Sequence, residues 1–392
     1  MYRLNDAQQL LVDTARSVAD RAIGPHADRV DRDGVFPKEA LGALATAGLM
    51  GLTVPASLGG LNQGFRTVAA VLDEIAQHCP STAMVYLMHL CGIACYATSP
   101  DKMAVYLTQA AAGRHLSTLA FSERESRSHF WAPVSRAIED AGTGGPNGRT
   151  GAVRLRAHKS FVTSAGHADG YVVSTLDPAA VTPVGSRIYL VLRDDAGVEV
   201  SGTWTGLGLR GNASAPMTLS DVSVGDERAL SEAGNGLGLM LSVVLPLFQV
   251  GSAAVALGIA EAAVRITQAH LTSARLEHMN STLAGLPTLR ARLAQMRVET
   301  DRARAHLTAV LDALEQPGPT TQLMVLEAKV AASEAAVTVT DLAMRACGGA
   351  AFGGSLGLDR RFRDARAAVV MSPTTDQAYD FIGRALCGME VF

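Results

Sequence analysis

Apolar positions in the N-terminal part of the chain recur with the period of an α-helix. Leu11, Ala15 and Val18 fall on one face of such a helix, as expected for an amphipathic segment. Asn5 precedes this helix as an N-cap, and Pro25 interrupts or kinks it. Similar patterns predict helices over residues 38–48, 67–78 and 81 to about 96. Residues 1–116 are therefore expected to form a helical domain.

The periodicity changes between about residues 115 and 230. Short alternating runs predict strands at residues 160–162, 170–174 and 187–192, and a Gly-Gly-Pro-Asn-Gly turn is expected at 144–148. The helical period then returns and predicts helices over 237–272, 287–314, 320–345 and 375–386. We therefore predict an α+β, mostly α fold, with an N-terminal helical domain (1–116), a small middle β-domain (117–232) and a C-terminal four-helix bundle (233–392).

The stretch between Glu232 and Glu261 contains no charged residue and resembles a membrane span in length. It also contains Asn235, Pro246 and Gln249, and a buried helix of a large bundle has the same composition. We therefore expect a core helix and no membrane association.

Composition narrows the class of protein further. The chain is 48% hydrophobic and 18% charged with a net charge of -3, which is typical of a soluble globular protein. It has no basic runs, so nucleic acid is not an expected partner. The five cysteines are few and odd in number, and the start of the chain lacks the apolar core of a signal peptide. These features favour a cytoplasmic location.

Several short motifs follow one another in a fixed order. They are GLTVPASLGG at 51–60, FSERESRSH at 121–129, KSFVTSA at 159–165, GLGLRG at 206–211, CGGAAFGG at 347–354, RRFRDAR at 360–366 and MSPTTD at 371–376. Together they resemble the acyl-CoA dehydrogenase family over nearly the whole chain. The resemblance implies a flavoprotein oxidoreductase that binds FAD and acts on an acyl thioester of coenzyme A or a carrier protein. It also implies a homodimer or, more usually, a homotetramer. Because acidic residues interleave with the arginines of 360–366, we expect that segment to form ion pairs at an interface.

The resemblance assigns the flavin ring to the middle domain. Ser122 and Thr163 match positions that contact the isoalloxazine, and Phe161 matches the aromatic residue that shields the ring. Ser128 lies in the segment that resembles the family's G-S-D motif and is included among the cofactor-binding residues. Alternatively, Ser122 and Thr163 are ordinary hydroxyl residues on the solvent-exposed face of a strand and do not bind a cofactor.

A pyrophosphate site is expected at the last helix. Thr374 and Gln377 have the spacing of a capping box, and a helix N-terminus of this kind attracts anions. By resemblance Asp376 also contacts the cofactor. The glycine loop of Gly348 and Gly349 lies opposite in the family, and Arg275 matches an arginine that reaches the cofactor of a neighbouring subunit. Alternatively, the glycine loop only ends one helix, the capping box only starts another, and neither binds a ligand.

The expected catalytic carboxylate is missing. Ser372 stands where most of the family has its glutamate, and Phe248 stands at the second position that a branch of the family uses. Ser372 retains a backbone N–H that can polarise a thioester carbonyl, but its hydroxyl is too weak a base to act unaided. Glu123, Asp376 and His129 are the candidate substitutes. A histidine suits acid–base work near neutral pH, although His129 is equally well explained as a hydrogen-bonded residue at a strand end.

Four functional hypotheses remain open from the sequence. The first is dehydrogenation of an acyl thioester by hydride transfer to the flavin with a non-standard base. The second is a flavin-dependent monooxygenase that uses reduced flavin and oxygen, with Phe130, Trp131 and Phe248 shaping an aromatic pocket. The third is redox-neutral carbanion chemistry on a carrier-bound substrate. The last is a non-enzymatic subunit of a hetero-oligomer.

Overall fold

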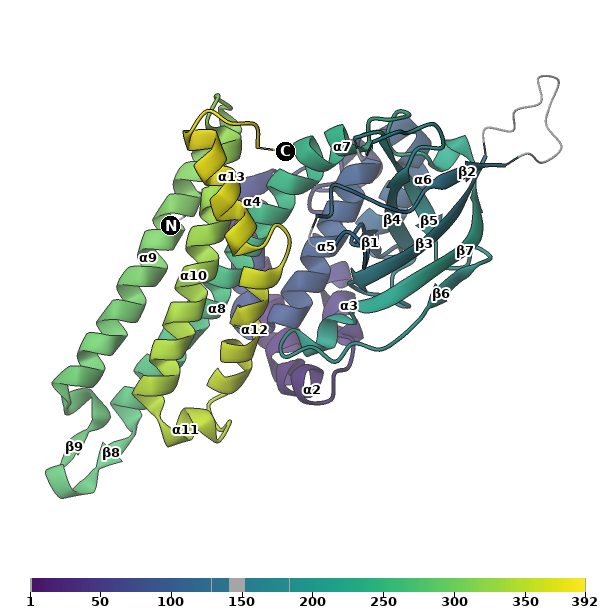
Figure 1. Cartoon of the computed structure of the whole chain (residues 1–392). Helices are drawn as coiled ribbons and strands as arrows, with labels where there is room; N and C mark the ends of the chain where they lie inside the picture. The colour runs from purple at the N-terminus through teal and green to yellow at the C-terminus, as the bar shows by residue number, and fades with distance from the viewer. Residues whose placement is uncertain (1, 128, 141–151, 183, 392) are drawn as a thin grey trace.

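The protein is helical at both ends of the chain, with a small β-unit between them (Figure 1). The structure is a computed structural model and describes residues 2–127, 129–140, 152–182 and 184–391. It is 58% helical with 14% strand, which confirms the predicted mostly α fold class. Ser128 and the predicted turn at 144–148 lie outside the described residues.

The N-terminal helices begin where their sequence signals place them. Asn5 caps the first helix: its side chain accepts from the Gln8 N–H at 2.9 Å, and the Gln8 side chain accepts from the Asn5 N–H at 3.0 Å. A π-helical turn, Ala19–Ile23, and a 3₁₀ turn that contains Pro25 then change the course of the chain, as predicted. The helices of this part are α1 (Asp6–Val18), α2 (Ala27–Arg32), α3 (Lys38–Thr46), α4 (Phe65–His78), α5 (Pro80–Tyr96) and α6 (Pro100–Ala111).

The middle unit consists of two small sheets. One has the strand order β1-β4-β5 and the other, entirely antiparallel, the order β2-β3-β7-β6. Apolar side chains from both sheets form one core, separate from the core of the helices. The three predicted strands are confirmed within β3, β4 and β5. The strands are β1 (Ser117–Ala120), β2 (Ala137–Glu139), β3 (Val153–Val162), β4 (Gly170–Leu176), β5 (Ser186–Leu192), β6 (Val198–Val200) and β7 (Ala215–Val224).

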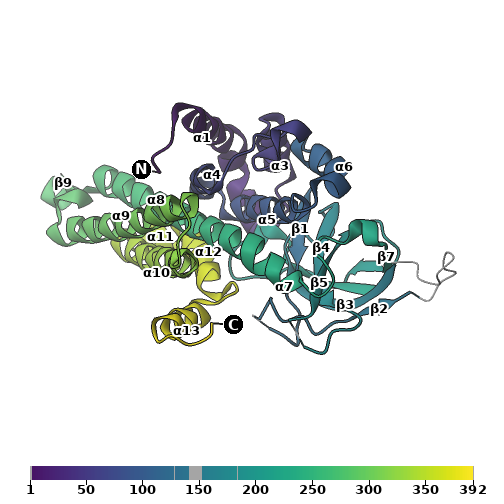
Figure 2. The ribbon, with the colours of Figure 1, turned by 90° about the horizontal axis from the view of Figure 1, so that it is seen from above.

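The C-terminal part is built on long helices that lie side by side (Figures 1 and 2). Its elements are α7 (Gly236–Leu239), α8 (Leu245–Ser273), β8 (Arg275–Leu276), β9 (Ser281–Thr282), α9 (Pro287–Glu315), α10 (Thr321–Cys347), α11 (Gly349–Phe352), α12 (Leu358–Val370) and α13 (Thr375–Leu386). Helix α8 packs between α4 and α10. The stretch Gly236–Ser273 is long and apolar enough to cross a membrane, but 89% of its most apolar window is buried inside the protein. The predicted core helix is therefore confirmed.

Helix α12 was not predicted, and it connects the C-terminal helices to the rest of the chain. Its Arg363 forms an ion pair with Asp31 at 2.6 Å, and its buried Asp364 accepts from the Leu209 N–H at 2.7 Å. Gly208 lies so close to this helix that a Cβ atom would come within 2.5 Å of the Arg363 carbonyl oxygen. The expected ion pairs of this segment are present and join α12 to α2, and the hydrogen bond to Asp364 joins it to the middle unit.

Candidate functional site

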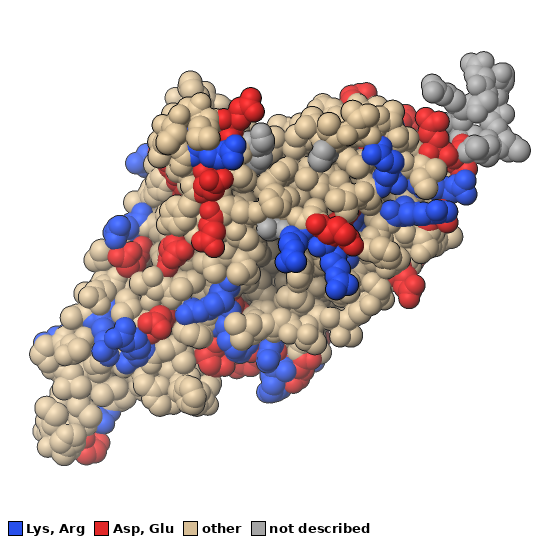
Figure 3. Space-filling model, in the orientation of Figure 1, with Lys and Arg blue, Asp and Glu red and all other residues tan. Residues whose placement is uncertain are grey.

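A deep pocket opens between the middle β-unit and the helices. Its volume is about 1110 Å³, slightly above the usual range for a small-ligand site. The space-filling view shows the hollow with basic and acidic side chains beside it (Figure 3). Arg124, Glu125 and Arg127 are the exposed charged residues of its lining. A pocket of this size holds a ring system together with part of a second molecule.

A bulge in β3 shapes one wall of the pocket. The register of β3 against β7 shifts between Lys159 and Val162, and such a bulge re-aims the side chain beside it. Phe161 has a φ of 54°, which is rare for a bulky residue and typical of functional sites. Its ring is 68% exposed and meets Trp204 edge to face, with 6.3 Å between the ring centroids. The chain therefore presents an aromatic shelf at the pocket.

Thr163 follows this shelf and is held on two sides. Its hydroxyl shares a 2.9 Å hydrogen bond with the Ser214 hydroxyl, and its carbonyl accepts from the Thr118 hydroxyl at 2.8 Å. Asn212 also lines the pocket and is buried, and its Oδ1 has no hydrogen-bond partner among the residues that the structure describes. A buried acceptor without a partner points to a group that comes from outside the chain.

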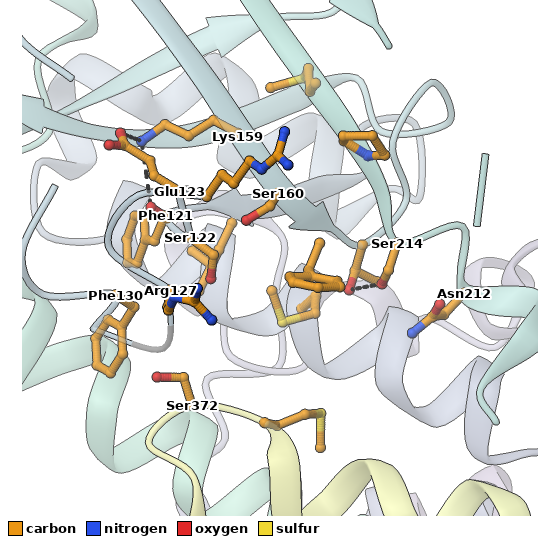
Figure 4. Close-up of a pocket in the computed structure, with 18 of the residues that line it drawn as sticks. Phe121, Ser122, Glu123, Arg127, Phe130, Lys159, Ser160, Asn212, Ser214 and Ser372 are labelled. Carbon is orange, nitrogen blue, oxygen red and sulfur yellow. Dashed lines mark hydrogen bonds and ion pairs between the residues drawn. The ribbon is translucent and has the colours of Figure 1, made fainter. Parts of the chain in front are cut away.

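Ser122 lies on the same side of the pocket, next to a buried ion pair (Figure 4). The Ser122 carbonyl accepts from the Ser160 N–H at 2.9 Å, which joins it to β3. Directly behind it, Lys159 Nζ lies 2.6 Å from Glu123 Oε1, and both side chains are almost fully buried. Burial alone would raise the pKa of Glu123, but the Lys159 ammonium and a hydrogen bond from Ser135 lower it. Glu123 is thus held as a carboxylate and supports the wall.

Ser372 comes from the opposite side, on the turn between α12 and α13 (Figure 4). The Ser372–Pro373 peptide bond is cis. Lys329 of α10 is fully buried behind the turn and donates to the Pro373 carbonyl at 2.9 Å and to the Met371 carbonyl at 3.4 Å. Burial lowers the pKa of Lys329 to about 8. The turn that carries Ser372 is therefore fixed from the side away from the pocket.

The structure places Ser122, Phe161, Thr163 and Ser372 around the same pocket, whereas His129 is not part of its lining. His129 is exposed, with its Nδ1 3.2 Å from the Ser126 carbonyl and its Nε2 3.4 Å from the Gln377 amide. Its neighbour Phe130 does line the pocket. His129 therefore lies at the edge of the site.

The predicted anion-binding residues fall into two separate groups. Thr374 caps α13 with the predicted capping box, in which the Thr374 hydroxyl accepts from the Gln377 N–H at 3.2 Å. The N-terminus of α13 and the exposed Asp376 lie beside the turn of Ser372. Along α10 this position corresponds to Lys329, whose ammonium lies 3.5 Å from the Thr375 hydroxyl. Gly348 follows the other end of α10, about 28 Å further along that helix at its usual rise per residue.

Arg275 lies with the glycine loop at that far end. A contact of 3.8 Å between the Cys347 sulfur and the Thr267 hydroxyl joins the ends of α10 and α8, and Arg275 directly follows α8. Arg275, Gly348 and Gly349 are all exposed. One chain therefore does not bring these three residues to the α13 N-terminus.

Sequence reasoning missed several pocket residues. Trp204, Asn212 and Ser214 belong to the wall only because their loop folds back beside β3, and no local pattern indicates this. Gln249 of the lining and Lys329, which supports the turn of Ser372 from behind, were not identified either, although a buried amide or charged side chain in a helix is a usable signal of a special position.

Comparisons with known proteins agree with this geometry. Family models for the N-terminal, middle and C-terminal domains of acyl-CoA dehydrogenases match residues 5–114, 118–222 and 234–387. The chain belongs to the acyl-CoA dehydrogenase family. Members of this family are flavin-dependent oxidoreductases.

Individual members of the acyl-CoA dehydrogenase family are similar along the whole chain. A cyclohex-1-ene-1-carbonyl-CoA dehydrogenase of Geobacter metallireducens is 27% identical, over 98% of this chain and 99% of its own. An acryloyl-CoA reductase (NADH) of Anaerotignum propionicum is 26% identical, over 96% and 93%. Butyryl-CoA dehydrogenase from Megasphaera elsdenii has the same fold, with a TM-score of 0.89 at 21% identity over 98% and 99% of the two chains. FMN-bound TdsC from Paenibacillus sp. A11-2 superposes with a TM-score of 0.84 at 23% identity over 96% and 97%.

The pocket fits the requirements of a flavin. A flavin needs hydrogen-bonding groups along its ring edge, a surface for the ring face and space for a substrate beside it. Ser122, Thr163 and the unpaired Asn212 oxygen supply polar groups, and Phe161 supplies an aromatic surface. Within the described lining, the carboxylates are Glu123, which is paired with Lys159, and the exposed Glu125.

Proposed function

We propose that the protein binds FAD in this pocket and oxidises an acyl thioester of coenzyme A or a carrier protein. The observation that carries the proposal is the arrangement of the pocket itself. Ser122, Phe161 and Thr163 form one wall, Ser372 stands on the other, and the space between them is large enough for a ring and an acyl group. When bound, the flavin supplies the acceptor for the hydride that leaves the substrate.

The residues of the chain hold the flavin and position the thioester. Ser122 and Thr163 hydrogen-bond the flavin edge, and the Glu123–Lys159 pair keeps that edge in place. The backbone N–H of Ser372 donates to the thioester carbonyl, which acidifies the neighbouring carbon. Apolar side chains such as Met88 and Phe248 surround the acyl chain.

The proton from the substrate carbon needs an acceptor other than residue 372. Glu123 is not the acceptor, because its carboxylate is paired with Lys159. We assign the proton to His129 at the pocket edge, which acts through solvent because its ring does not line the cavity. A His129→Gln variant should then lose rate at neutral pH and keep its affinity for thioesters. Unchanged rates would remove His129 from the mechanism.

The separation of the two anion-binding groups supports an assembly of at least two copies. Arg275, Gly348 and Gly349 of one copy would reach the pyrophosphate at Thr374 and Asp376 of another, as a homodimer or homotetramer. Light scattering of the purified holoprotein tests this. A monomer that binds FAD tightly would contradict it.

Anaerobic mixing with a panel of acyl thioesters tests the proposed reaction. We expect at least one coenzyme A or carrier-protein thioester to bleach the bound flavin. Of the predicted aromatic residues, Phe130 and Phe248 line the pocket together with Phe121, whereas Trp131 does not. This aromatic lining, in which the described carboxylates are the paired Glu123 and the exposed Glu125, favours a flavin-dependent monooxygenase as the second candidate. Thioesters that never bleach the flavin, together with oxygen uptake that depends on supplied reduced flavin, would decide for the monooxygenase.

A further inference from the structure

The inner part of the pocket is formed by helices and is almost entirely apolar. Its helical lining consists of Met84 and Met88 from α5, Val244, Leu245, Phe248 and Gln249 at the start of α8, and Ala367 and Val370 from α12. Gln249 is the only polar side chain in this set of described residues. It follows Leu245 by about one helical turn, so both residues lie toward the same face of α8.

The side-chain amide of Gln249 has no hydrogen-bond partner among the described residues. The residue is 0% exposed, and neither its Oε1 nor its Nε2 is paired within the part of the chain that the structure describes. Burying an amide without partners is unfavourable, and most buried polar groups in native proteins are paired. An unpaired amide in the lining of a ligand pocket is explained if the ligand itself supplies the partner.

We propose that Gln249 recognises a neutral hydrogen-bonding group, a hydroxyl or a carbonyl, on the acyl part of the substrate. This inference rests on the proposed thioester oxidation. A primary amide offers two donors and one acceptor group, which match either substituent. A charged substituent would need a counter-charge nearby, but Lys159 is paired with Glu123, and Arg124 and Arg127 are exposed.

The amide then acts as a specificity-determining residue. An unsubstituted acyl chain fills the same space but leaves the Gln249 amide unpaired. A chain with a correctly placed hydroxyl or carbonyl pairs with it. One such hydrogen bond corresponds to a preference of about tenfold, and sites that depend on a buried hydrogen bond can discriminate far more strongly.

A comparison of matched thioesters tests this proposal. The probes are coenzyme A thioesters of one chain length, either unsubstituted or with a hydroxyl or keto group at successive carbons. The dissociation constant of each is measured anaerobically from the change in the flavin absorption spectrum of the holoprotein. Wild type is expected to prefer one substituted thioester by about tenfold or more. Gln249→Met, which keeps the size and shape but removes the amide, should abolish that preference.

Ser252 provides a matched control. It lies on α8 close to Gln249, is 1% exposed, and has a buried hydroxyl without a partner in the described part of the chain, but it is not part of the pocket lining. Ser252→Ala should keep the substrate preference of wild type.

Thermal unfolding gives a second readout, because Gln249→Met removes an unpaired amide and should unfold at an equal or higher temperature.

Three results would overturn the inference. Wild type that binds all thioesters of one length equally would refute it while leaving the proposed function intact. Gln249→Met that keeps the preference would show that the amide does not cause it, and a variant that is markedly less stable or does not fold would show that the amide has a structural role. If no thioester perturbs the flavin spectrum, the proposed function fails first, and the inference fails with it.

Discussion

The Glu123–Lys159 pair behind Ser122 allows a quantitative test of how the pocket wall is built. Lys159→Met removes the ammonium that lies 2.6 Å from the carboxylate and leaves a buried charge without a counter-ion. Breaking a buried pair in this way typically costs 3–5 kcal/mol. Two backbone N–H groups, those of Val134 and Ser135, still donate to the other carboxylate oxygen at 2.8 and 2.9 Å. We therefore expect Lys159→Met to lower the free energy of unfolding by about 3 kcal/mol, at the lower end of this range.

A double-mutant cycle isolates the pair itself. Glu123→Gln alone should also destabilise, because Lys159 keeps the 2.6 Å hydrogen bond to the Ser174 carbonyl but loses its counter-charge. The double variant Glu123→Gln/Lys159→Met should cost less than the sum of the two single variants, by about 1 kcal/mol or more. Urea unfolding of the flavin-free protein gives the three values, and retention of flavin on purification reports on the displacement of Ser122.

A surface pair on the same strand serves as the control. Arg156 of β3 pairs with Asp221 of β7, and both side chains are largely exposed. Exposed pairs contribute little to stability, so Arg156→Met should leave unfolding and flavin retention nearly unchanged. A cost for Lys159→Met as small as that of Arg156→Met, or strictly additive single changes, would refute the role given to the buried pair.

Three further predictions concern other parts of the molecule. His89 donates from Nε2 to the Met50 carbonyl and accepts at Nδ1 from the Ser117 N–H, and burial lowers its pKa to about 4. The unfolded chain therefore binds a proton that the folded chain does not, and the fold should lose about 3 kcal/mol as the pH falls from 6.5 to 4. His89→Gln should flatten this part of the pH profile of urea unfolding, and an unchanged slope would show that other groups cause it. Lys329→Met leaves the Pro373 carbonyl without its donor and should lower the free energy of unfolding by about 1–3 kcal/mol; a fully stable variant would mean that the turn does not depend on Lys329. Ser372→Glu places a carboxylate on the wall opposite Ser122 and should speed anaerobic flavin bleaching about a hundredfold or more, whereas tight thioester binding with no gain in rate would contradict the base position assigned to residue 372.

Local features of the fold could be predicted because their causes are local. The caps at Asn5 and Thr374 depend on residues three positions apart, and the structure contains both capping boxes. The strands followed from alternation, and the long core helix from the absence of charge. Helix α12 was not predicted, because its closely spaced charged residues indicated an ion-pair segment but hid the apolar spacing of a helix. In the structure Arg360 and Arg361 are buried, and their guanidinium groups reach backbone carbonyls of α4.

The candidate site could be predicted only in part, because its geometry depends on distant segments. The order of the motifs predicted a single site that contains Ser122, Phe161, Thr163 and Ser372. The structure places all four around one pocket. The separation of Gly348 from Thr374 along α10 could not be read from the motifs, since order in the sequence does not give distance in space. The left-handed backbone at Phe161 and the unpaired amide of Gln249 are properties of the folded chain alone.

Titration of the flavin-free protein with FAD tests the central claim most directly, namely that the wall of Ser122, Phe161 and Thr163 is a flavin site. We expect saturable binding at a single site per chain, and weaker binding when Phe161→Ala removes the aromatic ring beside the pocket. Arg156→Met, on the outer face of the same strand, should bind as wild type does. A protein that takes up no FAD, or that binds it equally well after Phe161→Ala, would contradict the account.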